Sequence, residues 1–287
     1  MRSLIRLTIA VLLAFSLISL YNSPQYHQEF QGLWQQVVSK FNGLQEQISS
    51  EVGYGPVSNL SPKKVGVEVP RSEITDWQSV GTLGPAILGG SRSLKIEIDY
   101  TPASAPSASD EAVLSSVLGH YSGKQVSIVP DEGNLPVEKD YSLDTVVKLT
   151  EEHRSCFTSS TQVCLYFLFL PGSFENSAAL GAAYTSSAVA IMTEQIQNGS
   201  NALVSRDRIA TATITHELGH LFGLVNLIGK EVRPHEDPDH PGHSSNPNSV
   251  MYWAVEDLSV NSILSGGPVT TFDQDDEADI ALIRGNK

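Results

Sequence analysis

Hydrophobic and polar residues alternate with a period of two over residues 94–100, LKIEIDY, which is typical of a strand with one buried face. Residues 164–170, CLYFLFL, form a continuous apolar run, which predicts a central strand buried on both faces. Similar patterns occur elsewhere in the chain. They predict a strand over 125–130 and helices over 143–153, over 273–284, and from a cap at Ser109 or Asp110 to Leu118.

Strands and helices therefore alternate along the chain, and this order predicts an α/β domain built in layers. Residues 180–192, LGAAYTSSAVAIM, are small and uncharged, and they indicate further strand structure. Residues 226–248 show no periodicity and are expected to form an irregular segment. The segment between these two, residues 209–222, has an apolar, helical character.

The first twenty residues have the pattern of a targeting segment. Arg2 and Arg6 precede an uncharged apolar run from Leu7 to Leu20. No small-x-small cleavage site follows, so we favour an uncleaved membrane anchor over a cleaved signal peptide. Positive charge on the N-terminal side predicts that the rest of the chain lies outside the cytoplasm. A secreted protein is the alternative.

An apolar seam then recurs at steps of three and four residues, which predicts a helical stalk. The seam consists of Trp34, Val37, Phe41, Leu44 and Ile48. We expect at most weak self-association through this stalk. The alternative interpretation is an amphipathic helix that lies on the membrane or on the domain. Glycines and prolines between residues 53 and 62 then break the chain. The expected domains are a signal anchor or signal peptide at 1–21, a stalk at 22–60 and a globular domain at 61–287.

The charge balance is acidic, with 18 Lys and Arg against 32 Asp and Glu and a formal net charge of −14. This balance argues against nucleic acid as a partner, since binding to phosphates needs a basic face. The two cysteines, Cys156 and Cys164, are expected to form a disulfide that closes a short loop, because the chain is predicted to lie outside the cytoplasm. Zinc ligation by this pair is disfavoured, since no second cysteine pair exists.

The strongest candidate chemistry lies in the sequence HELGH at residues 216–220. Side chains four residues apart share one face of a helix, so His216 and His220 can both face one metal ion. Glu217 lies beside them, as a zinc hydrolase requires of the carboxylate that takes a proton from water. Gly223 then provides a residue suited to ending the helix. An ordinary helix with two surface histidines is the competing interpretation.

At HELGHLFGL followed by SVMY, the chain resembles the metzincin zinc peptidases, whose pattern is H-E-x-x-H-x-x-G-x-x-H with a later methionine turn, the Met-turn. His216, Glu217, His220 and Gly223 match that pattern in place. The third ligand position is Asn226, which departs from it, because an amide is a poor zinc ligand.

The spacing that follows resembles that of the archaemetzincins, with an insertion over 226–242. On that alignment His243 is the third zinc ligand, and Ser244 and Ser249 stand where those proteins have cysteines. The two serines put in doubt a second, cysteine-bound structural zinc. The resemblance also implies a Met-turn at Met251, which forms an apolar floor beneath the metal.

Three candidates remain open for the third ligand, in the order His243, His240 and Asn226. Histidines of the insertion that do not bind metal, His235 included, are expected to lie in a polar surface loop. The resemblance implies a metzincin-like α+β fold, with a mixed twisted sheet, an antiparallel edge strand and an active-site helix. Residues 182–192 are expected to form the edge strand that pairs with an extended substrate.

The expected function is a membrane-anchored zinc endopeptidase with one catalytic zinc ion, Glu217 as general base, and a peptide or protein substrate. Two other classes stay open. The first is a zinc-containing protein that binds peptides without cleaving them, and the second is a membrane-tethered assembly protein in which the stalk matters most. Zinc content and a peptidase assay separate the three.

Overall fold

The computed structural model describes residues 74–175, 177–255 and 267–285, so the expected targeting segment and stalk lie outside the described residues. The described residues form, in chain order, η2 (Ile74–Trp77), α3 (Gly84–Leu88), β1 (Ser93–Tyr100), α4 (Ala108–Ser122), β2 (Val126–Glu132), β3 (Asp140–Tyr141), α5 (Leu143–His153), β4 (Gln162–Leu170), β5 (Ser173–Phe174), β6 (Gly181–Ala183), β7 (Ala188–Met192), α6 (Thr193–Gly199), α7 (Arg206–Phe222), η3 (Trp253–Val255) and α9 (Gln274–Gly285). Here η denotes a 3-10 helix.

The main sheet has five strands in the order β2-β1-β4-β7-β6. The first four strands run parallel, and β6 pairs with β7 in the antiparallel direction. This arrangement confirms the predicted mixed α/β fold. The expected edge strand over 182–192 needs correction, because this segment divides into two strands. Of these two strands, β6 lies at one edge of the sheet, and β7 lies between β4 and β6.

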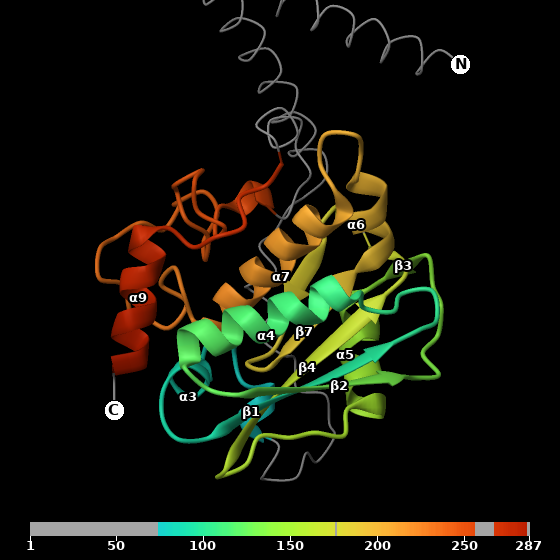
Figure 1. Cartoon of the computed structure of the whole chain (residues 1–287), viewed down its shortest axis with the longest axis horizontal. Helices are drawn as coiled ribbons and strands as arrows, with labels where there is room; N and C mark the ends of the chain where they lie inside the picture. Colours follow the sequence, from blue (N-terminus) through green and yellow to red (C-terminus); the bar gives the residue numbers. More distant parts are fainter. Residues whose placement is uncertain (1–73, 176, 256–266, 286–287) are drawn as a thin grey trace, which may run out of the picture. The chain divides into compact units, whose positions relative to one another are not determined.

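Helices cover both faces of this sheet (Figure 1), because its central strand β4 is apolar on both sides. Val163, Leu165, Phe167 and Phe169 pack in one core cluster with residues of α4 and α7. The alternate residues Tyr166, Leu168 and Leu170 pack in a second cluster with residues of α5. This packing confirms the prediction, made from the continuous apolar run, of a central strand buried on both faces.

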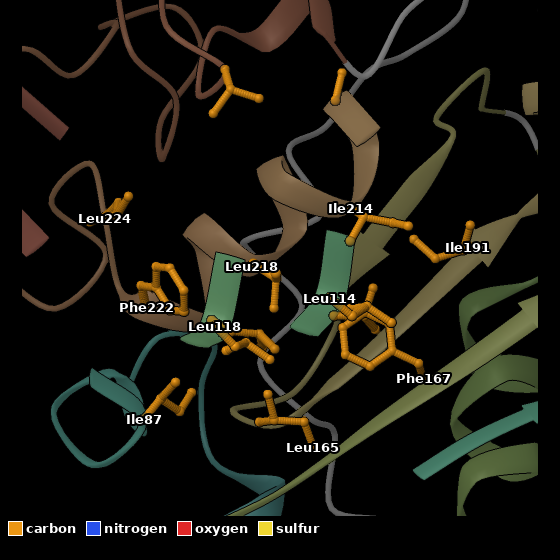
Figure 2. Packing of buried hydrophobic residues seen from close by; sticks show 14 of the residues in the cluster. Ile87, Leu114, Leu118, Leu165, Phe167, Ile191, Ile214, Leu218, Phe222 and Leu224 are labelled. Carbon is orange, nitrogen blue, oxygen red and sulfur yellow. The ribbon is translucent and has the colours of Figure 1, made fainter. Parts of the chain in front are cut away.

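Figure 2 shows how the larger cluster fixes α7 against the sheet and α4. Ile214 and Leu218 of α7 lie close to Leu114 and Leu118 of α4, above Phe167 of β4. All five side chains are inaccessible to solvent. Burying a side chain of this size stabilises the fold by about 1.5–3 kcal/mol, so these contacts hold the helix that carries the HELGH sequence in a fixed position.

The predicted start of α4 is wrong by two residues or more. Ser107 is the N-cap, because its Oγ accepts a hydrogen bond from the Asp110 backbone N–H at 3.2 Å. The Asp110 carboxylate in turn accepts from the Ser107 backbone N–H at 2.9 Å, which completes a capping box. Arg206, at the start of α7, binds the same carboxylate through both terminal nitrogens. The cap therefore also joins the N-terminal ends of α4 and α7.

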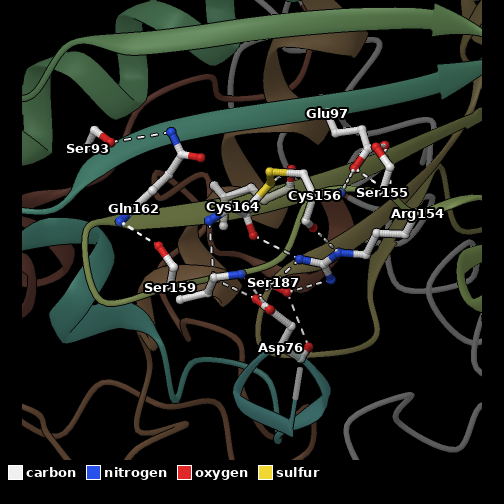
Figure 3. Close-up of a disulfide and its surroundings, with 12 residues drawn as sticks. Asp76, Ser93, Glu97, Arg154, Ser155, Cys156, Ser159, Gln162, Cys164 and Ser187 are labelled. Carbon is white, nitrogen blue, oxygen red and sulfur yellow. Dashed lines mark hydrogen bonds and ion pairs between the residues drawn. A yellow bond between two sulfur atoms is a disulfide. The ribbon is translucent and has the colours of Figure 1, made fainter. Parts of the chain in front are cut away.

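Figure 3 shows the disulfide between Cys156 and Cys164, which confirms the predicted pairing. Arg154 lies beside it and donates hydrogen bonds to the carbonyl oxygens of both cysteines, at 2.7 and 2.9 Å. The same guanidinium forms a fully buried ion pair with Asp76, at 3.2 Å. Glu97 of β1 accepts from the backbone N–H of Cys156 at 2.7 Å. These contacts attach the Cys156 loop and η2 to the sheet.

The expected location as a membrane-anchored, extracytoplasmic protein is contradicted. Among residues 74–175, 177–255 and 267–285, no helix has the length and apolar character needed to cross a bilayer. We therefore correct the expectation that the apolar run from Leu7 to Leu20 motivated. Neither membrane attachment nor an extracytoplasmic position enters the function proposed below.

Candidate metal centre

The helix α7 places the HELGH sequence inside the protein and not on its surface. Ser205 caps its first turn by accepting from the Arg208 N–H, and Gly223 ends the helix in the left-handed region at a φ of 86°. Both His216 and Glu217 have no exposed surface. The alternative of an ordinary helix with two surface histidines is therefore excluded for His216, because this ring is fully buried.

The imidazoles of His216 and His220 face each other along one side of α7. Their Nε2 atoms are 3.0 Å apart. The Nδ1 atom of His216 lies 2.6 Å from the carbonyl oxygen of Val250. This carbonyl can only accept a hydrogen bond, so Nδ1 carries the proton and the lone pair of the ring is on Nε2. The ring is thus held in the tautomer that a metal ligand needs.

His243 reaches the same place from the irregular segment after α7. His216, His220 and His243 each offer a nitrogen, and these three atoms lie within 4.8 Å of one another. The rings of His216 and His243 are stacked, with centroids 5.2 Å apart. The position of His243 is fixed through its neighbour, because the backbone N–H of Ser244 donates to the carbonyl of Met251 at 2.8 Å.

The other two candidates for the third ligand lie in different surroundings. His240 stacks on Trp253 with ring centroids 4.3 Å apart, and its Nδ1 lies 3.1 Å from Asp237. Asn226 adopts a positive φ of 63°, and its side-chain amide donates to Glu236 at 3.0 Å. The structure therefore brings His243 together with the two helical histidines, and it places His240 and Asn226 in other contacts.

Glu217 lies against the edge strand β6. Its Oε2 atom accepts a hydrogen bond from the Ala183 backbone N–H at 2.6 Å. A Cβ atom added at Gly181 would be 2.9 Å from Oε1 of the same carboxylate, so the close approach of strand and helix depends on glycine there. Sequence reasoning missed this contact, and the run of small residues at 181–183 was the only sign that could have indicated it.

Met251, which the resemblance implies as an apolar floor, packs against Gly219 of α7. It is fully buried, and a Cβ atom added at Gly219 of α7 would be only 2.2 Å from its sulfur. The backbone N–H of Met251 donates to Ser249 Oγ at 2.8 Å, and Ser249 donates to Asp276 of α9. The turn at Met251 is therefore fixed between α7 and α9.

The expectation that His235 lies in a polar surface loop is wrong. Its side chain is 6% exposed and forms ion pairs with Asp276 and Asp279 of α9. Sequence reasoning missed this contact. Asp276 and Asp279 lie in an acidic stretch at the start of α9, and nothing in that stretch indicates contact with a histidine distant in the sequence.

No family model matches the sequence, and no curated protein matches it. Similar solved structures include an archaemetzincin from Methanopyrus kandleri, at a TM-score of 0.43 and 18% sequence identity, with 68% of this chain and 94% of that chain covered. An archaemetzincin from Archaeoglobus fulgidus, complexed with malonate, matches at a TM-score of 0.38 and 16% identity, with 64% of this chain and 99% of that chain covered. These values are low, so we interpret the site from its own residues.

Proposed function

We propose that this protein is a zinc-dependent peptidase. The observation that carries the proposal is the convergence of His216, His220 and His243 within 4.8 Å of one another, next to the buried carboxylate of Glu217. Three imidazoles with an open fourth position are a ligand set typical of catalytic zinc. On this proposal the insertion over 226–242 displaces the third ligand along the sequence.

The residues present fit a zinc ion. Two ligands of a tetrahedral zinc with bonds of about 2.0–2.1 Å are about 3.3 Å apart, and the Nε2 atoms of His216 and His220 are 3.0 Å apart. The hydrogen bond from His216 Nδ1 to Val250 directs a lone pair to the same point. A bound zinc ion would supply Lewis acidity, which lowers the pKa of water and polarises a peptide carbonyl.

Glu217 is the residue that we propose as general base. Glu217 directly follows His216 on α7, and the Ala183 N–H holds its Oε2 atom in place. In peptide hydrolysis this carboxylate accepts a proton from the attacking water and passes it to the leaving nitrogen. The bond to β6 orients the carboxylate before substrate arrives, so little reorganisation is needed.

A peptide is the substrate class that the surroundings favour. The edge strand β6 pairs on one side with β7, and Ala183 on this strand directly contacts Glu217. An extended peptide can add to such an edge through backbone hydrogen bonds, which places its scissile bond beside the carboxylate. We propose that the catalytic domain begins near residue 61 and includes all these residues.

The substitution Glu217→Gln tests the proposed function. The variant should keep its zinc, since the three histidines are unchanged, and lose peptidase activity by about 10³-fold or more. Zinc content and the hydrolysis of a quenched fluorescent peptide library should be measured on wild type and variant together. A wild-type protein that binds zinc and peptide without hydrolysis would favour the peptide-binding alternative. Wild-type activity in Glu217→Gln would exclude Glu217 as the base.

A further inference from the structure

The backbone carbonyl that binds His216 belongs to a peptide group whose N–H is bonded as well. The peptide bond between Val250 and Met251 is trans, so its C=O and N–H lie in one plane and point in opposite directions. The Val250 oxygen lies 2.6 Å from His216 Nδ1. On the other side, the Met251 N–H donates to Ser249 Oγ at 2.8 Å. A contact that sets the direction of this N–H therefore also sets the direction of the carbonyl.

Ser249 can accept from the Met251 N–H in a fixed direction only if its own proton is held elsewhere. A serine hydroxyl has one proton to donate and lone pairs that accept. Ser249 Oγ donates its proton to Asp276 Oδ2, which leaves a lone pair for the Met251 N–H. An ionised carboxylate can only accept, so Asp276 fixes the direction of both hydrogen bonds. Ser249 and Asp276 have no exposed surface, which keeps bulk water from competing for these bonds.

His235 balances the negative charge of Asp276 in the interior. Its Nε2 atom lies 3.4 Å from Asp276 Oδ1. The pairing with Asp276 raises the pKa of His235 to about 9, so the ring is an imidazolium at neutral pH. Glu231 Oε1 and Asp279 Oδ2 also face this ring, at 3.7 and 3.9 Å. Buried carboxylates retain their charge only beside such a partner, so the imidazolium supports Asp276 as a pure acceptor.

We propose that Asp276 is a positioning residue for the candidate metal ligand His216, and that it acts through Ser249 and the peptide group between residues 250 and 251. The inference rests on the proposed function, because it assigns the residues that orient one zinc ligand. Asp276 and Ser249 hold the peptide group so that its carbonyl accepts from His216 Nδ1. This contact directs the Nε2 lone pair of the ring toward the metal position. The C-terminal helix α9 thus sets the geometry of a ligand on α7.

The alternative is that these hydrogen bonds only stabilise the turn at Met251. Two other backbone bonds hold the same turn. The Val250 N–H donates to the Thr271 carbonyl at 3.0 Å, and the Met251 carbonyl accepts from the Ser244 N–H at 2.8 Å. Both bonds remain when Ser249 loses its hydroxyl group. Removing that hydroxyl should therefore leave the turn folded and change mainly the orientation of the peptide group, which separates the two interpretations.

The substitution Ser249→Ala tests the inference, with Ser104→Ala as the matched control. Ser104 is another buried serine whose hydroxyl bonds twice, because it donates to the Phe169 carbonyl at 2.6 Å and accepts from the Thr101 N–H at 3.0 Å. Zinc titration of the full chain, well below its unfolding temperature, measures the effect on the metal site. Ser249→Ala should raise the zinc dissociation constant about 10-fold or more, which is typical for the loss of a group that orients a ligand. Ser104→Ala should leave the constant unchanged.

A double variant tests whether Asp276 acts through Ser249. Asp276→Ala alone should weaken zinc binding about as much as Ser249→Ala does. Adding Ser249→Ala to Asp276→Ala should have little further effect, because residues that act in one hydrogen-bond network are not additive. If the two losses of affinity multiply, or if Ser249→Ala and Ser104→Ala bind zinc equally well, the inference is overturned.

NMR of the metal-free protein separates this inference from the proposed function. The His216 Nδ1 proton, held by the Val250 carbonyl, should give a slowly exchanging imidazole signal that His216→Asn lacks. The signal should be unchanged in Ser104→Ala and shifted or lost in Ser249→Ala. If this pattern holds while wild type binds no zinc, the proposed zinc peptidase fails and the positioning role stands. If Ser249→Ala keeps the signal unshifted, the positioning role is overturned, whether or not the protein binds zinc.

Discussion

His216 donates a hydrogen bond from Nδ1 to the backbone carbonyl of Val250, at 2.6 Å. This bond connects the middle of α7 with the residue just before Met251. It fixes the tautomer and the orientation of the ring in one contact. Met251 also packs against Gly219. The helix and the turn therefore contact each other at two positions, His216 and Gly219, which are about one helical turn apart. The geometry of the candidate metal centre therefore depends on how closely the two segments approach.

Substituting Gly219 by Ala should disrupt that approach. The added methyl group would lie 2.2 Å from Met251 Sδ and 2.9 Å from Phe272, so the turn must move. We expect a loss of about 1–3 kcal/mol in the free energy of unfolding, together with weaker zinc binding. Chemical denaturation and zinc titration measure the two effects.

The matched control is Gly119→Ala in the interior of α4. Its added Cβ would meet a single atom, the Lys124 carbonyl oxygen at 3.7 Å, which is ordinary contact. This change should stabilise the protein by about 0.5–1 kcal/mol, the usual advantage of alanine in a helix. If the two substitutions change the free energy of unfolding equally, Met251 can move away from residue 219 without destabilising the protein.

Removing the disulfide should destabilise the protein without changing the metal centre. Cys156 and Cys164 are eight residues apart, and a closed loop of that size restricts the unfolded chain by about 2–3 kcal/mol. The double variant Cys156→Ala/Cys164→Ala should lose that amount in urea denaturation and keep its zinc. A thiol assay on unreduced, unfolded wild type should find no free thiol, and two free thiols would contradict the bond.

Asp99 should make stability depend on pH. Burial raises its pKa to about 6, although Tyr166 donates a hydrogen bond to it at 2.6 Å and opposes the shift. The folded state therefore binds a proton on the Asp99 carboxyl group more tightly than the unfolded chain does, in which the pKa of this group is 3.8. The contribution of Asp99 to stability is fully present below pH 4 and is lost as the pH rises through 6.

The variant Asp99→Asn removes this dependence, because its amide oxygen can still accept from Tyr166. It should be more stable than wild type by about 1–3 kcal/mol at pH 7, and the difference should shrink toward pH 4. Urea denaturation at several pH values measures the difference. Glu132→Gln, at an exposed position of β2, is the control, and a constant difference across the range would refute the assignment to Asp99.

Local patterns predicted most elements of this fold. The bounds of α5 match the expected helix over 143–153, and β1 and β4 follow their apolar patterns closely. The contacts between distant segments were not predictable in the same way. The burial of His235 depends on α9, about 40 residues later in the chain, and the capping of α4 depends on a serine that only the backbone geometry distinguishes from its neighbours. Sequence spacing determines which residues share a face of one helix. It does not determine where a loop places its side chains, because a loop can adopt many conformations.

The third ligand is the sharpest case of that limit, and zinc affinity can decide it. Loss of a residue that only orients a ligand weakens metal binding about 10–100-fold, so the loss of a direct ligand should cost about 100-fold or more. We therefore expect His243→Ala to raise the zinc dissociation constant by at least that factor, because its ring nitrogen lies with those of His216 and His220. His240→Ala should change the constant little, since His240 stacks on Trp253.

Both variants should be measured beside wild type in the same zinc titration. Asn226→Ala is the additional control, because the Asn226 amide contacts Glu236 and is not grouped with the histidines. Retention of wild-type affinity by His243→Ala, together with its loss in His240→Ala or Asn226→Ala, would show that the insertion alignment is wrong. The metal would then take its third ligand from His240 or Asn226, and the irregular segment would have to rearrange when zinc binds.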